Sequence, residues 1–153
     1  MSQAPDPSIP PYNPPPPLFT PLTPSDERTW AMLAHLSVLL NLITGILGTA
    51  AALVIYLVYK DRSRYVAYQS LQSLVMQLIV WVGGGVIVAA AWGLTGILSA
   101  VIVGLACIPF AACLSLLPFA AVVYGVIAGI QCSQGQDFRY WLVGDWLRGT
   151  IDH

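Results

Sequence analysis

Two rows of polar side chains stand inside otherwise apolar stretches of this sequence. Each row repeats at intervals of three or four residues, which places its members on one face of a helix. Polar groups inside apolar segments are costly, so these rows are the candidate functional faces. The first row is Ser37, Asn41 and Thr44, and the second is Gln69, Ser73 and Gln77 with Gln72 beside it.

Two interpretations of these rows fit the sequence. Hydroxyl and amide groups on facing helices could hydrogen-bond to one another and hold a helical bundle together. Alternatively, the rows could line a hydrated groove for a substrate or a translocating chain. The sequence favours the first interpretation and leaves the second open.

Residues that could do covalent or metal chemistry are sparse. His35 has no acidic or cysteine neighbour at a spacing suited to a metal site or a catalytic pair, so a packing or capping role is predicted. Cys107, Cys113 and Cys132 lack the CxxC spacing and are predicted to be small buried hydrophobes. The glycine triplet at residues 83–85 lacks the lysine of a phosphate-binding loop, and no HExxH or GxSxG motif occurs. We therefore expect no enzyme activity, no metal and no cofactor.

The composition surrounding these residues is that of a membrane protein. The chain of 153 residues is 57% hydrophobic and 8% charged, whereas about a quarter of an ordinary soluble domain is charged. Its apolar runs exceed the roughly 18 residues that mark a spanning helix. We therefore expect an all-α integral membrane helical bundle in the cell membrane, with the lipid bilayer as a partner. The net charge of −1 and the lack of a basic cluster argue against nucleic-acid binding.

The N-terminal residues 1–24 differ from the rest, because they contain ten of the twelve prolines. Proline removes a backbone donor and fixes φ, so a disordered, proline-rich cytoplasmic tail is expected, either as a plain spacer or as a docking segment with PxxP spacing. A helix should begin where Thr23 can cap it, with Asp26 completing a capping box. The helical membrane domain is expected over residues 25–148, followed by a short tail at residues 149–153.

The first apolar run, over residues 30–59, is too long to be one upright helix. About thirty residues of helix would reach about 45 Å, against a hydrocarbon core of about 30 Å. Asn41, Gly45 and Gly48 are poor residues for a helix interior and offer a break within the run. The run is therefore either one tilted span or a hairpin that turns near Gly45.

Two further apolar runs and a mixed C-terminal segment follow the charged turn at residues 60–64. The runs extend over residues 66–92 and 97–130, and Pro109 and Pro118 should kink the second of them. In the C-terminal segment, bulky apolar residues recur at helical spacing and predict a short helix at the membrane interface, where tryptophan and tyrosine are enriched. These residues are Phe138, Trp141, Leu142 and Trp146.

The positions of the basic residues bear on the number of spans. With four membrane segments every basic residue lies on one side of the membrane. With three segments Arg28 lies on the opposite side from the other five basic residues. Length argues the other way, because each half of the first run has only about 14 to 18 residues. We expect about four membrane segments with both termini cytoplasmic, and three spans are the alternative. The basic residues are Arg28, Lys60, Arg62, Arg64, Arg139 and Arg148.

Three segments carry short motifs in a fixed order. They are WAMLAHLSVLL at residues 30–40, SRYVAYQSLQSL at residues 63–74 and GQDFRYWLVGDWL at residues 135–147. Together they resemble a family of small prokaryotic membrane proteins of unknown function, related to the Tic-twenty-like component of the chloroplast inner-envelope translocon. Gln69 and Trp141 depart from that pattern, since many relatives have histidine and proline there. The motif positions are Trp30, His35, Gln72, Arg139 and Tyr140.

Two functions remain as expectations. The first is a non-enzymatic scaffold or subunit of a membrane complex. The second is a transport or protein-translocation component whose polar rows line a path, which the resemblance to a protein-import component also implies. A row of small residues on the last span lets another helix approach closely, either within the chain or from another copy or membrane protein. That row is Ala121, Gly125 and Gly129.

Overall fold

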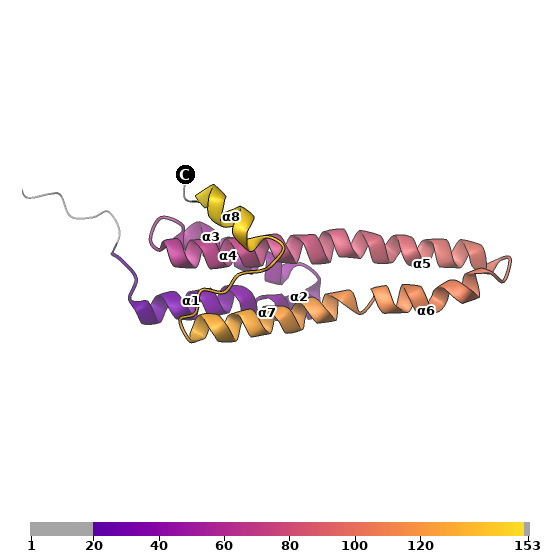
Figure 1. Ribbon diagram of the computed structural model, residues 1–153, viewed down its shortest axis with the longest axis horizontal. Helices are drawn as coiled ribbons and strands as arrows, with labels where there is room; N and C mark the ends of the chain where they lie inside the picture. The colour runs from indigo at the N-terminus through magenta and orange to yellow at the C-terminus, as the bar shows by residue number, and fades with distance from the viewer. Residues whose placement is uncertain (1–19, 152–153) are drawn as a thin grey trace, which may run out of the picture.

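The computed structural model describes residues 20–151, and every regular element within them is a helix (Figure 1). The all-α prediction is therefore confirmed, while most of the predicted proline-rich tail lies outside the described residues. The elements are α1 (Pro24–Leu36), α2 (Val38–Thr44), α3 (Leu47–Tyr59), α4 (Arg64–Gln77), the π-helical η1 (Leu78–Gly84), α5 (Gly85–Ser99), α6 (Gly104–Leu114), α7 (Leu117–Ser133) and α8 (Gly144–Ile151).

Two long helical rods form the axis of the molecule. The first joins α4, η1 and α5 over Arg64–Ser99, and the second joins α6 and α7 over Gly104–Ser133. Both rods are long and apolar enough to cross a membrane. At 1.5 Å per residue, the first rod of 36 residues is about 54 Å long, well beyond a hydrocarbon core of about 30 Å. The rods run antiparallel, side by side (Figure 1).

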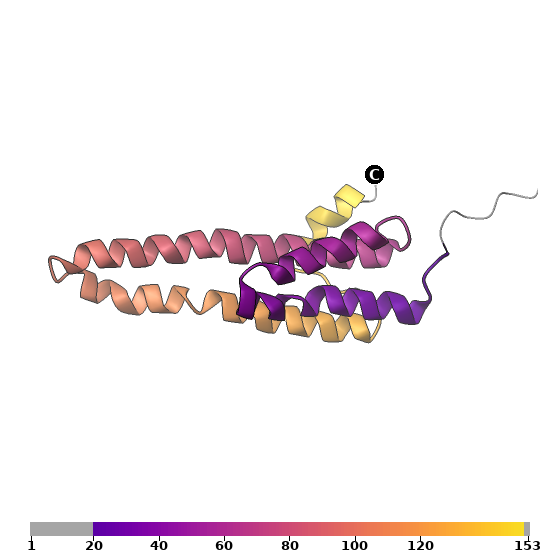
Figure 2. The ribbon, with the colours of Figure 1, turned by 180° about the vertical axis from the view of Figure 1, so that it is seen from behind.

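A short hairpin of α1, α2 and α3 packs on one half of these rods (Figure 2). Thr23 caps α1 by accepting a hydrogen bond from the Asp26 amide at 3.2 Å, as the capping box predicts. α2 ends at Gly45, whose φ of +77° lies in the left-handed region that favours glycine. The break predicted near Gly45 is therefore confirmed. α1 packs on α7 and α4, and α3 packs on α4.

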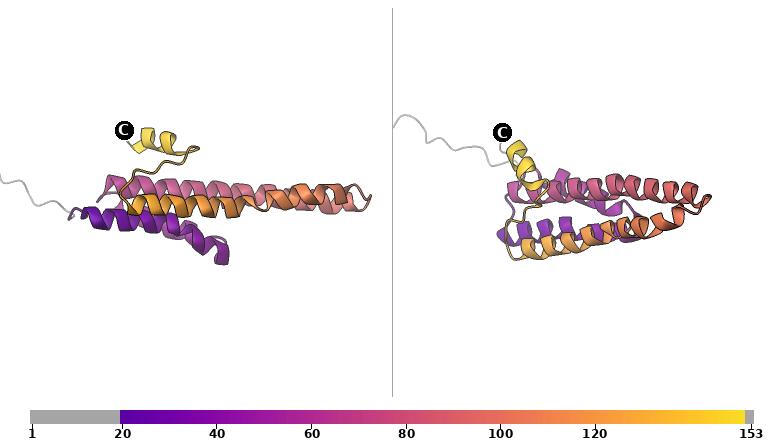
Figure 3. Two further views of the ribbon diagram at one scale, coloured as in Figure 1. Left: turned by 60° about the horizontal axis from the view of Figure 1, so that its bottom comes forward. Right: turned by 45° about the vertical axis from the view of Figure 1, so that its right-hand side comes forward.

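The molecule consequently has a wide end and a narrow end. At the wide end, which we call the head, α1 to α4, α7 and α8 lie together (Figure 1, Figure 3). At the narrow end, which we call the arm, α5 and α6 lie as a pair away from the hairpin. The arm is covered by apolar side chains, such as Ile97 and Ile102, which are 73% and 76% exposed. Residues 65–136 contain no charged side chain, so the described charges belong to the head.

Of the about four membrane segments predicted, the two rods are candidate spans by length and composition, and a bundle of four spans is not confirmed. α3 has 13 residues, and a transmembrane helix needs about 20. The hairpin is too short because it turns at Gly45 and its second helix ends at the charged loop of residues 60–63. The described chain therefore has two candidate membrane-spanning helices and one shorter apolar helix, α3.

The C-terminal segment differs from the prediction at its start. Residues 136–140 are not helical, and α8 begins only at Gly144 and continues to Ile151. Phe138 and Tyr140 turn into the head, where they are 7% and 3% exposed, while Trp141 is 80% exposed. Extended backbone points alternate side chains to opposite sides, so Phe138 and Tyr140 can both face the core.

The close approach of α7 to α1 depends on two glycines of the small-residue row. A Cβ atom on Gly125 would lie 2.9 Å from a methyl carbon of Val38, and one on Gly129 would lie 3.1 Å from the side chain of Leu36. The end of α1 and the start of α2 cover these glycines, so both serve packing within the chain. Ala121, the third member of the row, lines a groove between the rods.

Replacing Gly125 with leucine should force α7 away from the junction of α1 and α2 and destabilise the detergent-solubilised chain. Overpacking of this kind costs about 1–3 kcal/mol, so the unfolding midpoint should fall by several degrees. Gly93→Leu is the matched control, because a Cβ atom at Gly93 would meet no heavy atom within 4 Å. Both variants replace a glycine inside a helix with leucine, so the change in helix propensity is the same. Circular dichroism melting measures both midpoints. Equal midpoints for the two variants would contradict this packing.

Candidate functional site

The predicted polar rows meet in the centre of the head, where six of their seven members are buried. Three other residues join them, namely His35 of α1, Thr49 of α3 and Tyr140 of the C-terminal segment. We call the two hydrogen-bonded groups the histidine cluster and the asparagine cluster. The histidine cluster contains His35, Gln69, Gln72 and Tyr140, and the asparagine cluster contains Ser37, Asn41, Thr49, Ser73 and Gln77.

The histidine cluster is built around one fully buried imidazole ring. His35 Nε2 lies 3.0 Å from Gln69 Oε1, and His35 Nδ1 lies 3.2 Å from the Tyr140 hydroxyl oxygen. An amide oxygen can only accept, so Nε2 carries the proton and Nδ1 accepts from the tyrosine. Burial lowers the pKa of His35, which lies in α1 outside the two candidate spans, from 6.5 to about 4. The ring is therefore neutral near pH 7 and orients its neighbours.

The side chains of Gln69 and Gln72 hydrogen-bond the C-terminal segment to α4. The Gln69 amide group donates to the Phe138 carbonyl and to Asp137 Oδ1, both at 3.1 Å. The Gln72 amide group donates to the same carbonyl at 3.1 Å, and its oxygen accepts from the Tyr140 backbone amide at 3.0 Å. Backbone groups that a helix would satisfy internally are thus satisfied by glutamine side chains.

Aromatic rings close the histidine cluster on its other side. Phe138 meets Tyr140 edge to face with 4.9 Å between ring centroids, and it meets Tyr124 of α7 at 5.6 Å. His35 lies edge-on to Phe138 at 5.8 Å. Such contacts pack the non-helical segment against α1 and α7.

The asparagine cluster caps α3 with a side chain from another helix. Ile46 precedes α3 and supplies no side-chain cap. Instead, Asn41 Oδ1 accepts from the backbone amides of Gly48 at 2.7 Å and Thr49 at 3.2 Å, which are free donors of the first turn. Asn41 Nδ2 also donates to Gln77 Oε1 at 2.9 Å. One asparagine therefore links α2, α3 and α4.

Gln77 connects the asparagine cluster to α1. Its Nε2 donates to Ser37 Oγ at 3.0 Å and to Ser73 Oγ at 2.9 Å. Both serine hydroxyls donate in turn to the Ala34 carbonyl at 2.7 Å. No buried side-chain nitrogen or oxygen of either cluster is left without a partner. The clusters are therefore closed hydrogen-bond networks.

Thr44 is the one predicted row member outside the clusters. Its hydroxyl donates to the Leu40 carbonyl at 2.8 Å and accepts from the Leu47 amide at 3.1 Å. Thr44 therefore shapes the turn of the hairpin. The sequence did not indicate Thr49 as a member of the cluster, because it lies eight residues after Asn41. The turn predicted near Gly45 could have indicated it, because a turn brings the residues before and after it close together.

The predicted topology-setting residues all belong to the head, where they lie in α1, in the loop between α3 and α4, at the start of α4 and in the C-terminal segment. Two of them form ion pairs within the C-terminal region: Arg139 pairs with Asp145 at 3.2 Å, and Arg148 pairs with Asp137. This placement puts all six on one side of the molecule, as the positive-inside rule requires of one membrane face. The residues are Arg28, Lys60, Arg62, Arg64, Arg139 and Arg148.

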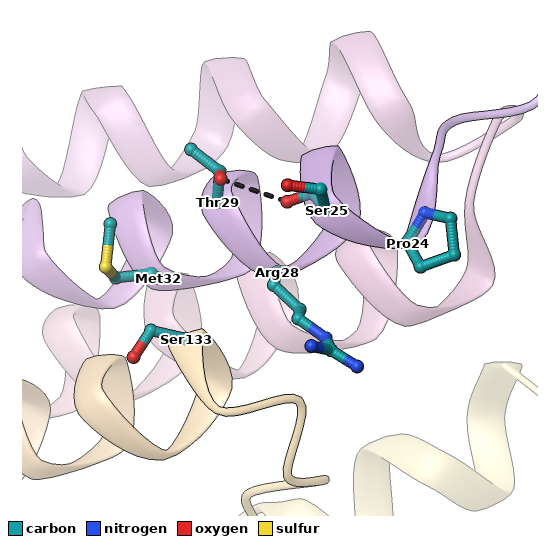
Figure 4. Close-up of a pocket in the computed structure, with 6 residues that line it drawn as sticks. All are labelled: Pro24, Ser25, Arg28, Thr29, Met32 and Ser133. Carbon is teal, nitrogen blue, oxygen red and sulfur yellow. Dashed lines mark hydrogen bonds between the residues drawn. The ribbon is translucent and has the colours of Figure 1, made fainter.

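A shallow cavity of about 260 Å³ lies between the start of α1 and the end of α7 (Figure 4). Arg28 reaches past it to the end of α7, where a Cβ atom on Gly135 would lie 2.6 Å from the arginine Nε. A cation is favourable at a helix C-terminus, so the charge of Arg28 is well placed there. Thr29 is engaged by its own helix, donating to the Ser25 carbonyl at 3.0 Å. Within residues 20–151, no group of three or more histidine, cysteine or acidic side chains could hold a metal ion.

Comparison with known protein families gives a match over most of the chain. Residues 26–147 match the model of the magnetosome magnetite crystal formation protein family. No curated protein and no solved structure matches the chain. The resemblance to the translocon-related family is therefore wrong, since all three segments that suggested it lie inside the matched residues. Short motifs rich in leucine and aromatic residues are common at the ends of membrane helices and do not identify one family.

Gln72→Leu should release the C-terminal segment from α4. The substitution leaves the Tyr140 backbone amide without its acceptor, at a cost of about 1–3 kcal/mol. Hydrogen–deuterium exchange at Tyr140 should therefore become faster. Gln134→Leu is the control, because that exposed side chain bonds to the Gln136 side chain. Unchanged exchange at Tyr140 in the Gln72 variant would show that this amide is held by other contacts.

The neutral His35 should make the chain less stable as the pH falls. Its folded pKa of about 4 lies below the unfolded value of 6.5, so the unfolded chain binds more protons between these values. A contribution of about 3 kcal/mol, present above pH 6.5, is thus lost progressively toward pH 4. Thermal unfolding midpoints at pH 7 and pH 5 should differ more for the unaltered chain than for His35→Gln, which stays neutral. The account fails if the two chains respond equally to pH.

Proposed function

Since the family model covers residues 26–147, the chain belongs to the magnetosome magnetite crystal formation protein family, and we propose that it serves this process as a non-enzymatic scaffold in the magnetosome membrane. The head would hold or position other components of the process on the cytoplasmic side. The rods would anchor the head in the bilayer.

The closed networks of the head carry this proposal. A catalytic or transport site needs polar groups that are free to meet a substrate or water. In the head, the buried amides and hydroxyls are bonded to one another or to the backbone. Their geometry supports helix association and does not favour a polar path through the molecule.

The distribution of charge supports a scaffold that acts from one side. The positive-inside rule orients the head, which carries all six basic residues, toward the cytoplasm, so the arm faces the other side of the membrane. Mineral surfaces and iron ions attract carboxylates and other oxygen ligands. The turn of the arm, residues 100–103, reads Ala-Val-Ile-Val and has no side chain with an oxygen atom. We therefore assign the contribution to crystal formation to the organisation of membrane components rather than to direct binding of mineral beyond the membrane.

A scaffold without chemistry should tolerate loss of its reactive groups. In a magnetite-forming strain that lacks the chain, crystals should be altered, and a version with Cys107, Cys113 and Cys132 changed to alanine should restore them. Electron microscopy measures crystal size and number, and immunoblotting checks that each version accumulates. Normal crystals without the chain would contradict the role in crystal formation. Defective crystals with a fully accumulated cysteine-free chain would contradict the scaffold.

A further inference from the structure

The two ends of the molecule differ in cross-section. In the head, the hairpin, α4 and α7 lie beside one another and α8 is added on the outside, whereas the arm consists of α5 and α6 (Figure 1, Figure 3). The hairpin also leans away from the rods toward its tip, as the left panel of Figure 3 shows. A membrane that holds this molecule must therefore make more room on the side of the head.

The hairpin stops partway along the first rod. Asn41, near its tip, is bonded to Gln77, the last residue of the 14-residue α4. Beyond Gln77 the rod continues through the seven residues of η1 and the 15 residues of α5. Those remaining residues reach about 33 Å, so the arm extends far beyond the hairpin tip toward the other side of the membrane. The hairpin therefore lies only on the side of the head, and its own surface shows whether it enters the bilayer.

The surface of the hairpin shows what covers it. Its tip and outer face are apolar, with Ile43 85%, Ile46 62% and Val54 57% exposed. At its base, the rings of Trp30 and Tyr59 lie 4.8 Å apart, and the basic loop of residues 60–64 follows. Aromatic and basic residues mark the headgroup level, and apolar residues beyond them mark the acyl chains. The occupant that fits is the lipid of one leaflet, with anionic headgroups around the base.

We propose that the chain is a membrane wedge, which binds preferentially to bilayers that are convex on the side of its head. The hairpin occupies area in one leaflet while the arm alone occupies the other. Insertion into one leaflet makes binding sensitive to curvature, and convex curvature provides the extra area that the head requires. The inference rests on the membrane insertion in the proposed function and not on the role in crystal formation.

Sorting between flat and curved membrane tests the wedge. The full chain, cysteine-free with Asp61→Cys in the head loop, is reconstituted into giant vesicles, and nanotubes are pulled outward from them. An impermeant fluorescent maleimide added outside the vesicles labels molecules whose head faces outward. To see the inward heads, all molecules are labelled before reconstitution and the fluorescence outside the vesicles is then quenched. Outward heads should be enriched at least twofold in the tubes, and inward heads should be depleted. Equal density of both orientations in tube and vesicle would overturn the wedge.

A lengthened hairpin gives a second readout. Adding about seven apolar residues, two helical turns, to the end of α2 and to the start of α3 would let the hairpin cross the bilayer and remove the difference between the ends. Sorting should then disappear for both orientations, and sorting that persists in this variant would contradict the wedge. The two orientations of the unlengthened chain decide the question even if the longer hairpin does not fold. Crystal formation is not read in either assay, so these outcomes are separate from those of the scaffold.

Discussion

Polar groups buried away from water must find partners, and the face of α4 that carries Gln69, Ser73 and Gln77 imposes this requirement on the whole head. α1 meets it with His35 and α2 meets it with Asn41, while the C-terminal segment contributes backbone groups. Sliding any of these elements along α4 would leave amides without partners in apolar surroundings. The networks therefore specify one arrangement of the hairpin, the rods and the C-terminal segment.

The shape of the molecule follows from where this polar face ends. After Gln77 the first rod carries apolar side chains and the three glycines at residues 83–85, where a Cβ atom would meet nothing within 4 Å. The hydroxyls of Thr95 and Ser99 donate to carbonyls of α5, and Trp92 Nε1 donates to Ser115 Oγ of the second rod, so none of these bonds involves the hairpin. The hairpin accordingly ends beside Gln77, and α5 and α6 continue as a pair. A pattern of polarity along one helix thus produces a wide head, a narrow arm and the one-sided insertion that we infer.

Spacing along the chain predicted the helices, the capped start of α1, the break at Gly45 and the polar face of α4. It could not predict which groups meet, because spacing defines a face and not what lies against it. Thr44 continues the first row in sequence, yet α2 ends there and the side chain serves the turn. The spacing of Phe138 and Trp141 fits a helix. The structure has non-helical backbone at residues 136–140, where the glutamine side chains of α4 bond to the Phe138 carbonyl and the Tyr140 amide. These tertiary hydrogen bonds outweigh the helical spacing of the C-terminal segment, which predicts the structure correctly only from Gly144 onward.

The wedge requires that the hairpin enters one leaflet and stops there, while the rods cross the bilayer. Spin labels on cysteines placed at Ile43, in the hairpin tip, and at Ile102, in the arm turn, report their depth in a bilayer. Depth follows from electron paramagnetic resonance saturation in the presence of oxygen, which enriches in hydrocarbon, and of a nickel chelate, which stays in water. The account predicts that the label at Ile43 lies within the hydrocarbon on the head side and that the label at Ile102 lies at the opposite surface. A label at Ile43 that lies at the same surface as the label at Ile102 would contradict it.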